Sequence, residues 1–503
     1  MSLCVDQDVQ SLACTRSIIN SQTTSTTHKA MKIYSKFTTM IAGAAALMAT
    51  GLYAEPSDES VIVRITGSTA FRSATHSAIV AMYDSAPVAG FAGSNLSGSG
   101  RSFFYGTIGG TKTIVTTSWS GSTGGIQVVS GSIPVGFLPD NLADSTATPA
   151  LTAAGAGATG GTQINSSSSF GPNSQVADVA MGDTFQSSTP FKTPVLNSQA
   201  VGVIGFVWLA NRGLSSQMVS KTNVTLTNGS AVVSMADVTG IQAGMNVKAT
   251  TGLPTSYVTV VSVDSGANTV TLSHNATAAS TTATLTFARP APITNINTQQ
   301  AQALWGAGTA SLAQFTGLAS DASTLVYATG RDPDSGTRLT AFAESGIGAN
   351  STVTQYRPTV TGSGATAVIT ALAPYPQQVV NGITFTEGNG GESSGGTLVG
   401  YFGHVSTPGL ILSYVSTGDA PTAVNNGAVQ LTYNGVPYSL DAIKEGRYTF
   451  WCYQHVMYQP TIAAAKKTVA DLMADKIRTV TAPIKLSEMK CSRATDGAVV
   501  FHD

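Results

Sequence analysis

Charged residues are scarce in this chain. Only 10% of its 503 residues are Asp, Glu, Lys or Arg, and 25 basic residues almost balance 26 acidic ones. With a net charge of −1 the chain has no basic surface to collect a polyanion, so we expect no nucleic-acid partner. The six histidines lack the spacing of a zinc site such as HExxH, and we expect no metal and no other cofactor.

Long apolar runs are also missing, apart from one short segment near the start. Residues 31–54 contain two lysines, an apolar stretch from 40 to 52, and Leu-Tyr-Ala before Glu55. This pattern predicts a cleaved signal peptide and therefore a location in the periplasm, outside the cell or on its surface. The alternative is a buried helix. If the signal peptide begins at residue 31, residues 1–30 are an over-extended start or an unusual extension. We therefore predict no part of the fold from them.

Cysteine is nearly absent from the mature chain. Cys4 and Cys14 precede the predicted cleavage site, and only Cys452 and Cys491 follow it. In an oxidising compartment these two could form a disulfide. Two unpaired thiols in a packed C-terminal region fit the sequence equally well, because spacing alone does not place their Cα atoms at bonding distance.

What the chain does contain is an apolar share of 42%, typical of a globular protein, and a repeated strand-loop-helix pattern. The first unit has a strand at 61–65 and a helix over 71–82, with Ser68 or Thr69 as its cap. A second follows "TKTIVTTSW" at 111–119, with a turn at 121–125. The third places "SGT" at 335–337 between the strand "STLVYATG" and a helix that stops at Ser345-Gly346. All three loops carry a small polar triplet.

The third loop, "RDPDSGTR" at 331–338, concentrates four charged residues in a chain that has few. A helix start presents unpaired backbone N–H groups and partial positive charge, so Ser and Thr hydroxyls beside it suit an anion. The same residues also cap ordinary helices. The charges at 331, 332, 334 and 338 fit either an anion site or surface ion pairs around a turn.

Several other segments have a distinctive composition. Residues 139–176 are rich in Ala, Gly and Ser without periodicity and predict a long surface loop. Alternating Val and Thr at 221–288 predict a small all-β module inserted in a larger domain. Helices are expected at "TQQAQALW" and over the last apolar stripe, at 461–480. Gly391 to Gly395 match the nucleophile motif G-x-S-x-G, but "GTLVGYFG" after it is interpreted as a strand, so we expect no catalytic residues and no enzyme.

The order of these motifs resembles that of the periplasmic phosphate-binding proteins of ABC transporters, in the type II periplasmic-binding superfamily. Each matching piece is short, and the resemblance extends over most of 60–480 apart from the loop at 139–176 and the β module. The pieces are "TGSTAF" (66–71), "SGSTGGI" (120–126), "VADVAMGD" (176–183), "NINTQQAQALWGAG" (295–308), "RDPDSGTRLTAF" (331–342), "GGTLVGYFG" (395–403) and "AIKEGRYTFW" (442–451).

The resemblance implies an α/β fold of two lobes, the two-lobed type II periplasmic-binding fold, with the small all-β domain inserted. We predict the first part of lobe 1 at 55–200, lobe 2 at 201–394 with the β insert at 221–288, and a return to lobe 1 at 395–503 with a C-terminal helix.

It also implies the residues that hold the ligand. These are Ser68, Thr69, Ala70, Phe71, Ser120, Ser122, Asp183, Arg331, Ser335, Gly336 and Thr337. Arg331 would offer a planar donor fork to the anion. An ionised, buried Asp183 cannot donate, so it would favour an oxyanion that carries its own proton, as hydrogen phosphate does.

The chain departs from the family pattern in two places. Pro333 stands where the family usually has the acidic partner of the arginine, and the second loop reads Ser-Thr-Gly-Gly instead of Ser-Gly-Ala-Gly. The implied function is capture of phosphate or a similar oxyanion by a monomer that hands it to an ABC permease. The alternative is a surface or adhesion protein that keeps the fold as a scaffold, with the β insert making the contacts.

Overall fold

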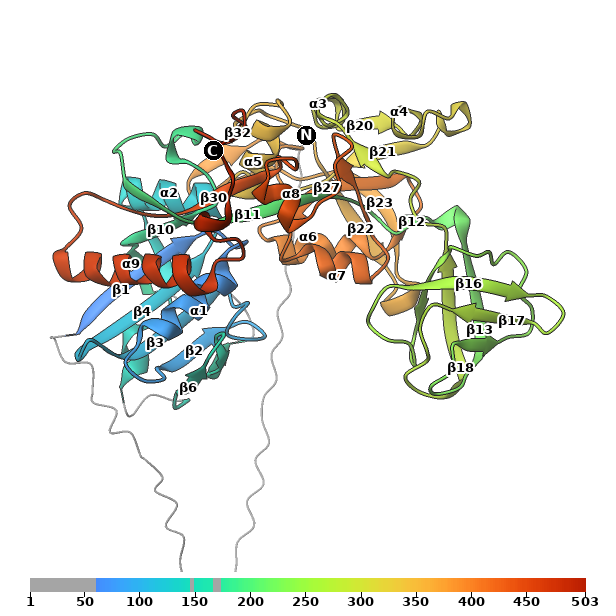
Figure 1. Cartoon of the computed structure of the whole chain (residues 1–503), viewed down its shortest axis with the longest axis horizontal. Helices are drawn as coiled ribbons and strands as arrows, with labels where there is room; N and C mark the ends of the chain where they lie inside the picture. Colours follow the sequence, from blue (N-terminus) through green and yellow to red (C-terminus); the bar gives the residue numbers. More distant parts are fainter. Residues whose placement is uncertain (1–59, 145–148, 166–172) are drawn as a thin grey trace, which may run out of the picture. The chain divides into compact units, whose positions relative to one another are not determined.

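The computed structural model describes residues 60–144, 149–165 and 173–503 (Figure 1). The predicted signal peptide at 31–54 and the preceding residues 1–30 lie outside the described residues. Among the described helices, none combines the length and apolar character needed to cross a bilayer.

The first lobe is built on a sheet in which parallel strands meet at one edge. β1 (Val61–Gly67) lies between β4 (Thr111–Trp119) and β10 (Val179–Gly182) and is parallel to both. β3 (Arg101–Ile108) and β2 (Val88–Ala92) continue the sheet antiparallel beyond β4. Because β1, β4 and β10 run in one direction, the loops that follow them leave from the same edge of the sheet.

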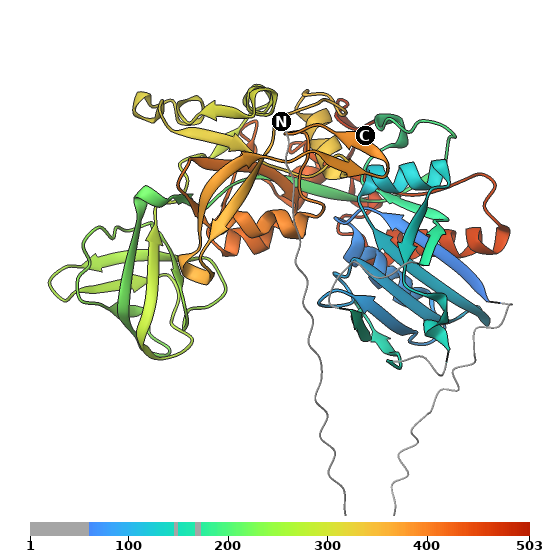
Figure 2. The ribbon, with the colours of Figure 1, turned by 180° about the vertical axis from the view of Figure 1, so that it is seen from behind.

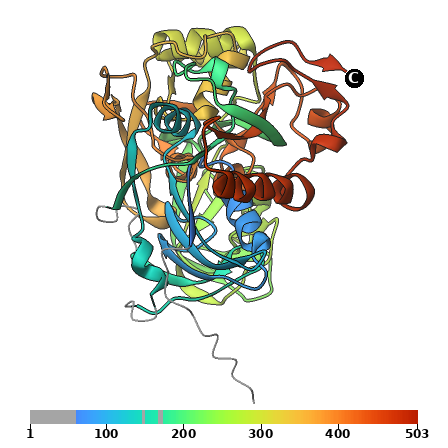
Figure 3. The same cartoon turned by 90° about the vertical axis from the view of Figure 1, so that its left-hand side faces the viewer.

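Three helices cover this sheet on its two faces. α1 (Arg72–Met82) packs against α9 (Ala464–Lys476), as Figure 3 shows, over the face that carries Val63 and Val179. α2 (Ser122–Gly131) packs on the opposite face, with Ala180 and Met457. Successive strand residues point to opposite faces, so the apolar strands β1 and β10 can serve both layers. The predicted strand-loop-helix units at 61–82 and 111–131 are confirmed.

Two long strands join the lobes. β11 (Asn197–Ala210) pairs with β30 (Trp451–Tyr458) along its first part and with β27 (Leu410–Ser416) along its last part. β30 also pairs with β10, so the hydrogen-bonded path runs without a break from the first lobe into the second. The buried aromatic cluster around Trp208 lies at this junction, with Phe450 stacked on it at 5.1 Å between ring centroids.

The second lobe continues from β27 to β21 (Leu325–Ala328) and β20 (Thr309–Ser311), with β28 (Val429–Gln430) beside β11. α5 (Gly336–Glu344) packs against β27 on one face, and α6 (Gly395–Phe402) with α7 (Ala420–Asn425) on the other. A second sheet orders β12 (Gly213–Leu214), β26 (Val405–Ser406), β23 (Val368–Pro374) and β22 (Tyr356–Thr361).

The remaining described elements are short. They are the helices α3 (Thr298–Ala307), α4 (Ala313–Thr316) and α8 (Leu440–Lys444), and the strand pairs β5 (Pro134–Phe137) with β9 (Asn173–Val176), β19 (Asn295–Ile296) with β29 (Thr432–Tyr433), β24 (Gln378–Val380) with β25 (Ile383–Phe385), and β31 (Cys491–Ser492) with β32 (Phe501–His502).

The predicted β insert is a closed barrel, drawn in green in Figure 2. Around the barrel the order is β13 (Met218–Leu226), β14 (Val232–Ser234), β17 (Thr269–Leu272), β16 (Val258–Asp264), β15 (Asn246–Ala249) and β18 (Ser280–Ala288). Its alternating valines form a core of their own, with Leu285 and Phe287. Closure pairs the sheet edges that short Val/Thr strands would otherwise expose. The predicted α/β fold of two lobes with an inserted all-β domain is therefore confirmed.

The structure corrects the predicted long loop at 139–176. Its described residues contain β6 (Thr152–Gly155), β7 (Thr159–Gly160), β8 (Thr162–Asn165) and β9. β6 and β8 both pair with the edge strand β2. Small residues give no periodic signal, but their backbone groups still complete the edge of an existing sheet.

The segment after Ser394 is also corrected. "GTLVGYFG", interpreted as a strand, forms α6, and Ser394 caps it by accepting a hydrogen bond from the N–H of Thr397 at 3.1 Å. The chain was predicted to return to the first lobe at 395, but β27 and β28 still pair with the second-lobe end of β11. The return begins with β30.

Cys452 and Cys491 are both free thiols, so the disulfide alternative is wrong and the packed-thiol alternative is right. Cys452 is buried within β30, and the Cys491 Sγ donates to the carbonyl of Ile443 at 3.5 Å. Burial raises the pKa of both thiols, which disfavours the thiolate that disulfide exchange requires.

The barrel is tied to the second lobe by a buried cation. Arg212, between β11 and β12, donates to the Thr286 hydroxyl at 3.0 Å and to the Thr286 carbonyl at 2.7 Å, and it also binds the Asn246 side chain. Only 1% of Arg212 is exposed, and burial lowers its pKa to about 10. Within the described residues its charge is balanced by oxygen dipoles alone, without an ion pair.

We predict that Arg212→Ala lowers the free energy of unfolding by roughly 2–4 kcal/mol, because several buried acceptors lose a charged donor together. Urea unfolding followed by tryptophan fluorescence measures this. The matched control is Arg289→Ala, an exposed arginine that contacts the Gln242 side chain at 2.6 Å, with an expected change within about 0.5 kcal/mol. Equal losses of stability from the two substitutions would contradict the role given to Arg212 in tying the barrel to the second lobe.

Candidate functional site

The predicted site residues lie in loops that follow strand ends. Ser68 to Phe71 connect β1 to α1, Ser120 to Ser122 connect β4 to α2, and Asp183 comes directly after β10. These three strands are neighbours in the first lobe. Residues 331–335 lie between β21 and α5 in the second lobe, and Gly336 and Thr337 begin α5. The structure brings the two groups into contact.

Asp183 lies at the centre of this contact and is 1% exposed. The hydroxyl of Ser122 donates to its Oδ1 and accepts the Asp183 N–H at 3.0 Å. Thr337 donates to the Oδ2 at 3.3 Å from the other lobe. At Gly336, a Cβ atom would stand 1.8 Å from the Asp183 Oδ1, so only glycine lets α5 begin this close to the carboxyl group.

The surroundings of Asp183 favour its neutral form more than the sequence indicated. Burial raises its pKa above the ordinary value, against the opposing effects of the Ser122 hydroxyl and of Arg331. A neutral carboxyl group can donate as well as accept a hydrogen bond. The preference for a protonated oxyanion, expected of an ionised Asp183, therefore depends on pH.

Arg331 is held by backbone carbonyl groups where the family pattern has a carboxylate. Its Nε donates to the carbonyl of Glu392 at 2.9 Å, and its Nη2 donates to the carbonyl of Ser393 at 2.8 Å. The Nη2 also reaches the Thr69 hydroxyl of the first lobe at 3.3 Å. The missing acidic partner at Pro333 is thus replaced by the loop before α6. No ion pair neutralises Arg331 within the described part of the chain.

A second guanidinium group lies close by and was missed from the sequence. Arg72 is the first residue of α1, and its pKa is lowered first by burial and further by the charge of Arg331, while Asp419 raises it. Its position directly after the "TGSTAF" motif is the sequence feature that could have indicated a place for Arg72 in the site. Two cations that repel one another within one cluster favour the binding of an anion.

The charged residues at 331–338 are buried, so the alternative of surface ion pairs is wrong. Arg331, Asp332, Asp334 and Arg338 are between 2% and 6% exposed. Burial raises the pKa of Asp332 to about 6, against the charges of Arg331 and Arg338. Burial and the neighbouring Asp332 raise the pKa of Asp334 to about 8.

The hydroxyl groups in the three loops have different partners. Ser335 caps α5 by accepting the N–H of Arg338 at 3.2 Å, whereas the Ser68 and Ser120 hydroxyls are buried without a partner among the described residues. The side chain of Phe71 packs into the core and that of Ala70 packs against it, so both would offer a ligand only backbone N–H groups. Neither Ser68 nor Thr69 caps α1, because the helix begins at Arg72.

The match to a nucleophile motif at Gly391 to Gly395 carries no catalytic arrangement in the described structure. Ser393 does precede a helix, contrary to the sequence interpretation, but its backbone carbonyl serves Arg331. His455, which lies downstream of the motif in β30, shares a hydrogen bond with the Ser198 hydroxyl at 3.1 Å.

The fold resembles that of phosphate-binding proteins. A protein from Clostridium perfringens, solved with bound phosphate and assigned as a phosphate ABC transporter substrate-binding protein, is 10% identical with a TM-score of 0.38; the match covers 84% of this chain and 99% of that one. An ABC-type phosphate transport receptor from Vibrio cholerae is 11% identical with a TM-score of 0.37, covering 83% and 96%. PstS from Borrelia burgdorferi is 10% identical with a TM-score of 0.31, covering 82% and 92%.

These are proteins of the class that the sequence motifs resemble. No protein-family model matches the chain, and no curated protein does.

The pKa of Asp334 predicts how stability depends on pH. A folded-state pKa of about 8, raised above the ordinary 3.8, means that the neutral carboxyl stabilises the fold at low pH. This contribution is lost as the pH rises through about 8. We expect the melting temperature to fall between pH 5 and pH 8, and Asp334→Asn, which keeps the shape without titrating, to flatten that fall.

Scanning calorimetry at several pH values measures the slope. The control is Asp84→Asn, because the N–H groups of Gly109 and Gly110 lower the pKa of the exposed Asp84. Asp84 is therefore ionised in both folded and unfolded states from pH 5 to pH 8, and its substitution should leave the slope unchanged. The same slope in wild type and Asp334→Asn would refute the role given to Asp334.

Proposed function

We propose that this chain is an exported solute-binding protein that captures phosphate or a similar oxyanion between its two lobes for ABC-type uptake. The observation that supports it most is Arg331, a cation that is 2% exposed, has no ion pair among the described residues and reaches the Thr69 hydroxyl of the first lobe at 3.3 Å. The hydroxyl of the adjacent residue Ser68 is buried without a partner among the described residues, and the charge of Arg331 also lowers the pKa of Arg72. A site that presents positive charge and free donors in a buried setting binds an oxyanion.

Each lobe supplies part of this site. The first lobe contributes Ser68, Thr69 and Arg72, and the second contributes Arg331 in a fixed orientation. The Asp183 contact with Thr337 and the Arg331 contact with Thr69 join the lobes directly. An anion bound to both halves would stabilise the closed arrangement, as hinge-closing receptors require.

We predict that the purified mature protein binds phosphate and that Arg331→Lys weakens binding at least tenfold, about 1.4 kcal/mol. Lysine keeps the charge but loses the planar fork and the bonds to both carbonyl groups. Titration calorimetry with phosphate and with sulfate measures this, after unfolding and refolding to remove carried-over ligand. Asp183→Asn should also weaken phosphate binding.

The matched control is Arg447→Lys, an exposed arginine paired with Glu445 at 2.6 Å, which should bind phosphate as wild type does. If wild type gives neither heat nor thermal stabilisation with phosphate or sulfate, the uptake function fails. The alternative of a surface or adhesion protein then gains.

We predict that the barrel can be removed without loss of phosphate binding. The N–H of Arg289 donates to the carbonyl of Gln217 at 3.3 Å, so the chain ends left by deleting 218–288 are already adjacent. Arg212→Gln should accompany the deletion, because its acceptors Asn246 and Thr286 are removed. Calorimetry should give the same phosphate affinity within about twofold. A folded deletion variant that no longer binds would place the barrel in the site.

A further inference from the structure

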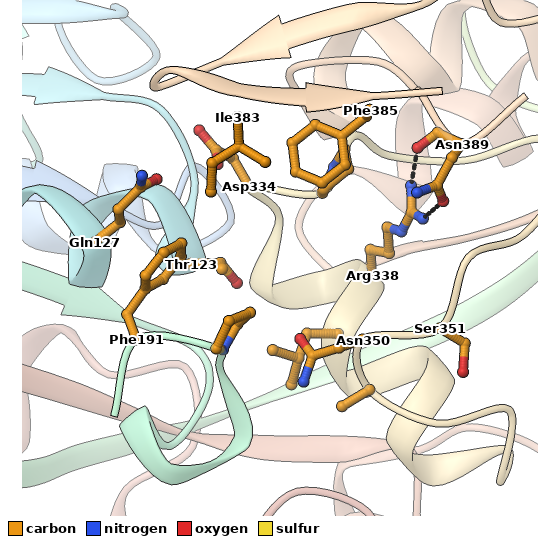
Figure 4. A pocket seen from close by; sticks show the side chains of 14 residues that line it. Thr123, Gln127, Phe191, Asp334, Arg338, Asn350, Ser351, Ile383, Phe385 and Asn389 are labelled. Carbon is orange, nitrogen blue, oxygen red and sulfur yellow. Dashed lines mark hydrogen bonds between the residues drawn. The ribbon is translucent and has the colours of Figure 1, made fainter. Parts of the chain in front are cut away.

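The residues proposed to hold the anion, Ser68, Thr69, Arg72 and Arg331, are called the oxyanion cluster below. A cavity of about 250 Å³ lies beside this cluster and is more apolar than the cluster (Figure 4). Phe191, Leu339, Ile383 and Phe385 give it apolar walls, while Gln127 and Asn350 place amide groups at its margin. The volume is far above the ~15 Å³ that one water molecule needs. Apolar walls with a few amide groups are typical of sites for small organic molecules.

The cavity and the oxyanion cluster share the same two chain segments. Thr123, in the cavity wall, follows Ser122, which binds Asp183. Asp334, also in the wall, precedes the cap residue Ser335. The N–H groups of Thr123 and Gly124 donate to the Asp334 carbonyl at 2.9 and 3.3 Å. This contact between α2 and the α5 loop is the partition between the two spaces.

The charges around the cavity favour a neutral occupant. Arg338 is engaged by the Asn389 carbonyl at 2.9 Å and by the Asn389 side chain, as the dashed lines in Figure 4 show. It also lies over the Phe342 ring, at 5.0 Å from the centroid. The Asp334 carboxyl accepts from the Asn381 amide at 2.9 Å and would repel a second anion when ionised. The Thr123 hydroxyl is buried without a partner among the described residues and can bind a polar atom.

Both lobes contribute walls to this cavity. Thr123, Gln127 and Phe191 come from the first lobe, and Leu339, Ile383 and Phe385 from the second. The β24–β25 hairpin reaches across, since the Gln127 amide donates to the Asn381 carbonyl at 3.1 Å. A molecule in the cavity therefore touches the same two bodies that an anion in the cluster would join.

We propose that the ligand is a phosphate monoester whose neutral, partly apolar organic group fills this cavity while its phosphate is held by the oxyanion cluster. This inference rests on the proposed oxyanion function. Binding of such an ester requires the partition between Thr123 and Asp334 to open, because the ester oxygen has to pass between α2 and the loop before α5.

Titration calorimetry with phenyl phosphate, inorganic phosphate and benzyl alcohol tests the inference. We expect wild type to bind phenyl phosphate at least tenfold more tightly than inorganic phosphate, and benzyl alcohol weakly. Phe385→Ala, which removes an aromatic wall, should cut phenyl phosphate affinity at least fivefold and leave inorganic phosphate within twofold. The matched control is Val379→Ala on the same hairpin, 66% exposed and outside the cavity lining, which should change neither affinity.

The binding results distinguish a phosphate monoester ligand from capture of a simple oxyanion. Phenyl phosphate binding no tighter than inorganic phosphate would overturn the monoester assignment and leave oxyanion capture standing. An equal loss for both anions in Phe385→Ala would also overturn it, because the ring would then support the site generally. If neither anion binds to wild type, the proposed function itself falls, and the inference with it.

Discussion

The burial of charge at residues 331–338 is the constraint on which the rest of the site depends. A chain with 10% charged residues places four of them, between 2% and 6% exposed, in one loop. Burying a guanidinium group without oxygen partners is costly, so the structure has to surround Arg331 with acceptors. It uses backbone carbonyl groups of Glu392 and Ser393, whose partial charges orient the cation without neutralising it.

That arrangement in turn needs a rigid loop before α6. The N–H of Glu392 donates to the Gly330 carbonyl at 2.9 Å, and its carbonyl accepts the N–H of Asp332 at 3.1 Å. The Glu392 carboxylate accepts hydrogen bonds from the Tyr375 and Tyr401 hydroxyls at 3.2 and 2.9 Å. The two tyrosines therefore fix the residue whose carbonyl orients Arg331.

The two lobes meet through few but specific contacts in the site and through a continuous ladder elsewhere. Arg331 with Thr69, Thr337 with Asp183, and Thr123 with Asp334 join the lobes at the site. β11 and β30 carry the backbone connection and the shared core. The contacts of Arg331 with Thr69 and of Thr337 with Asp183 can exchange for bonds to a ligand at modest cost, whereas the buried ladder cannot, so we expect any opening of the lobes on the site side.

Much of the fold was predictable because periodicity survives in the long elements. The residues at 71, 75, 78, 79 and 82, of which the first caps α1 and the others lie within it, are all buried, as their helical spacing predicts. The segment at 395–402 was interpreted as a strand although it forms α6, because its glycines and β-favouring residues hide the helical spacing of its apolar residues. Leu398, Val399 and Phe402 share one buried face of α6 against the second-lobe sheet. Tertiary burial selected the helix over local preference.

The candidate site was predictable in its loops and much less so in its chemistry. Hydrogen bonds join Ser122, Asp183 and Thr337, and another joins Arg331 to Thr69. Arg72 was missed because a lone arginine at a helix start gives no signal without its spatial neighbour. The raised pKa of Asp183 was missed for the same reason, since burial is a property of the surrounding fold.

The sequence by itself determined the long periodic elements, the order of the three polar loops and the presence of a separate β module, because these follow from local periodicity and composition. Only the tertiary structure decided which groups orient Arg331, which carboxyl groups favour their neutral forms, and that an apolar cavity adjoins the anion cluster. Each of those depends on residues distant in sequence, such as Glu392 beside Arg331 and Phe191 beside Phe385, that meet only when the two lobes pack.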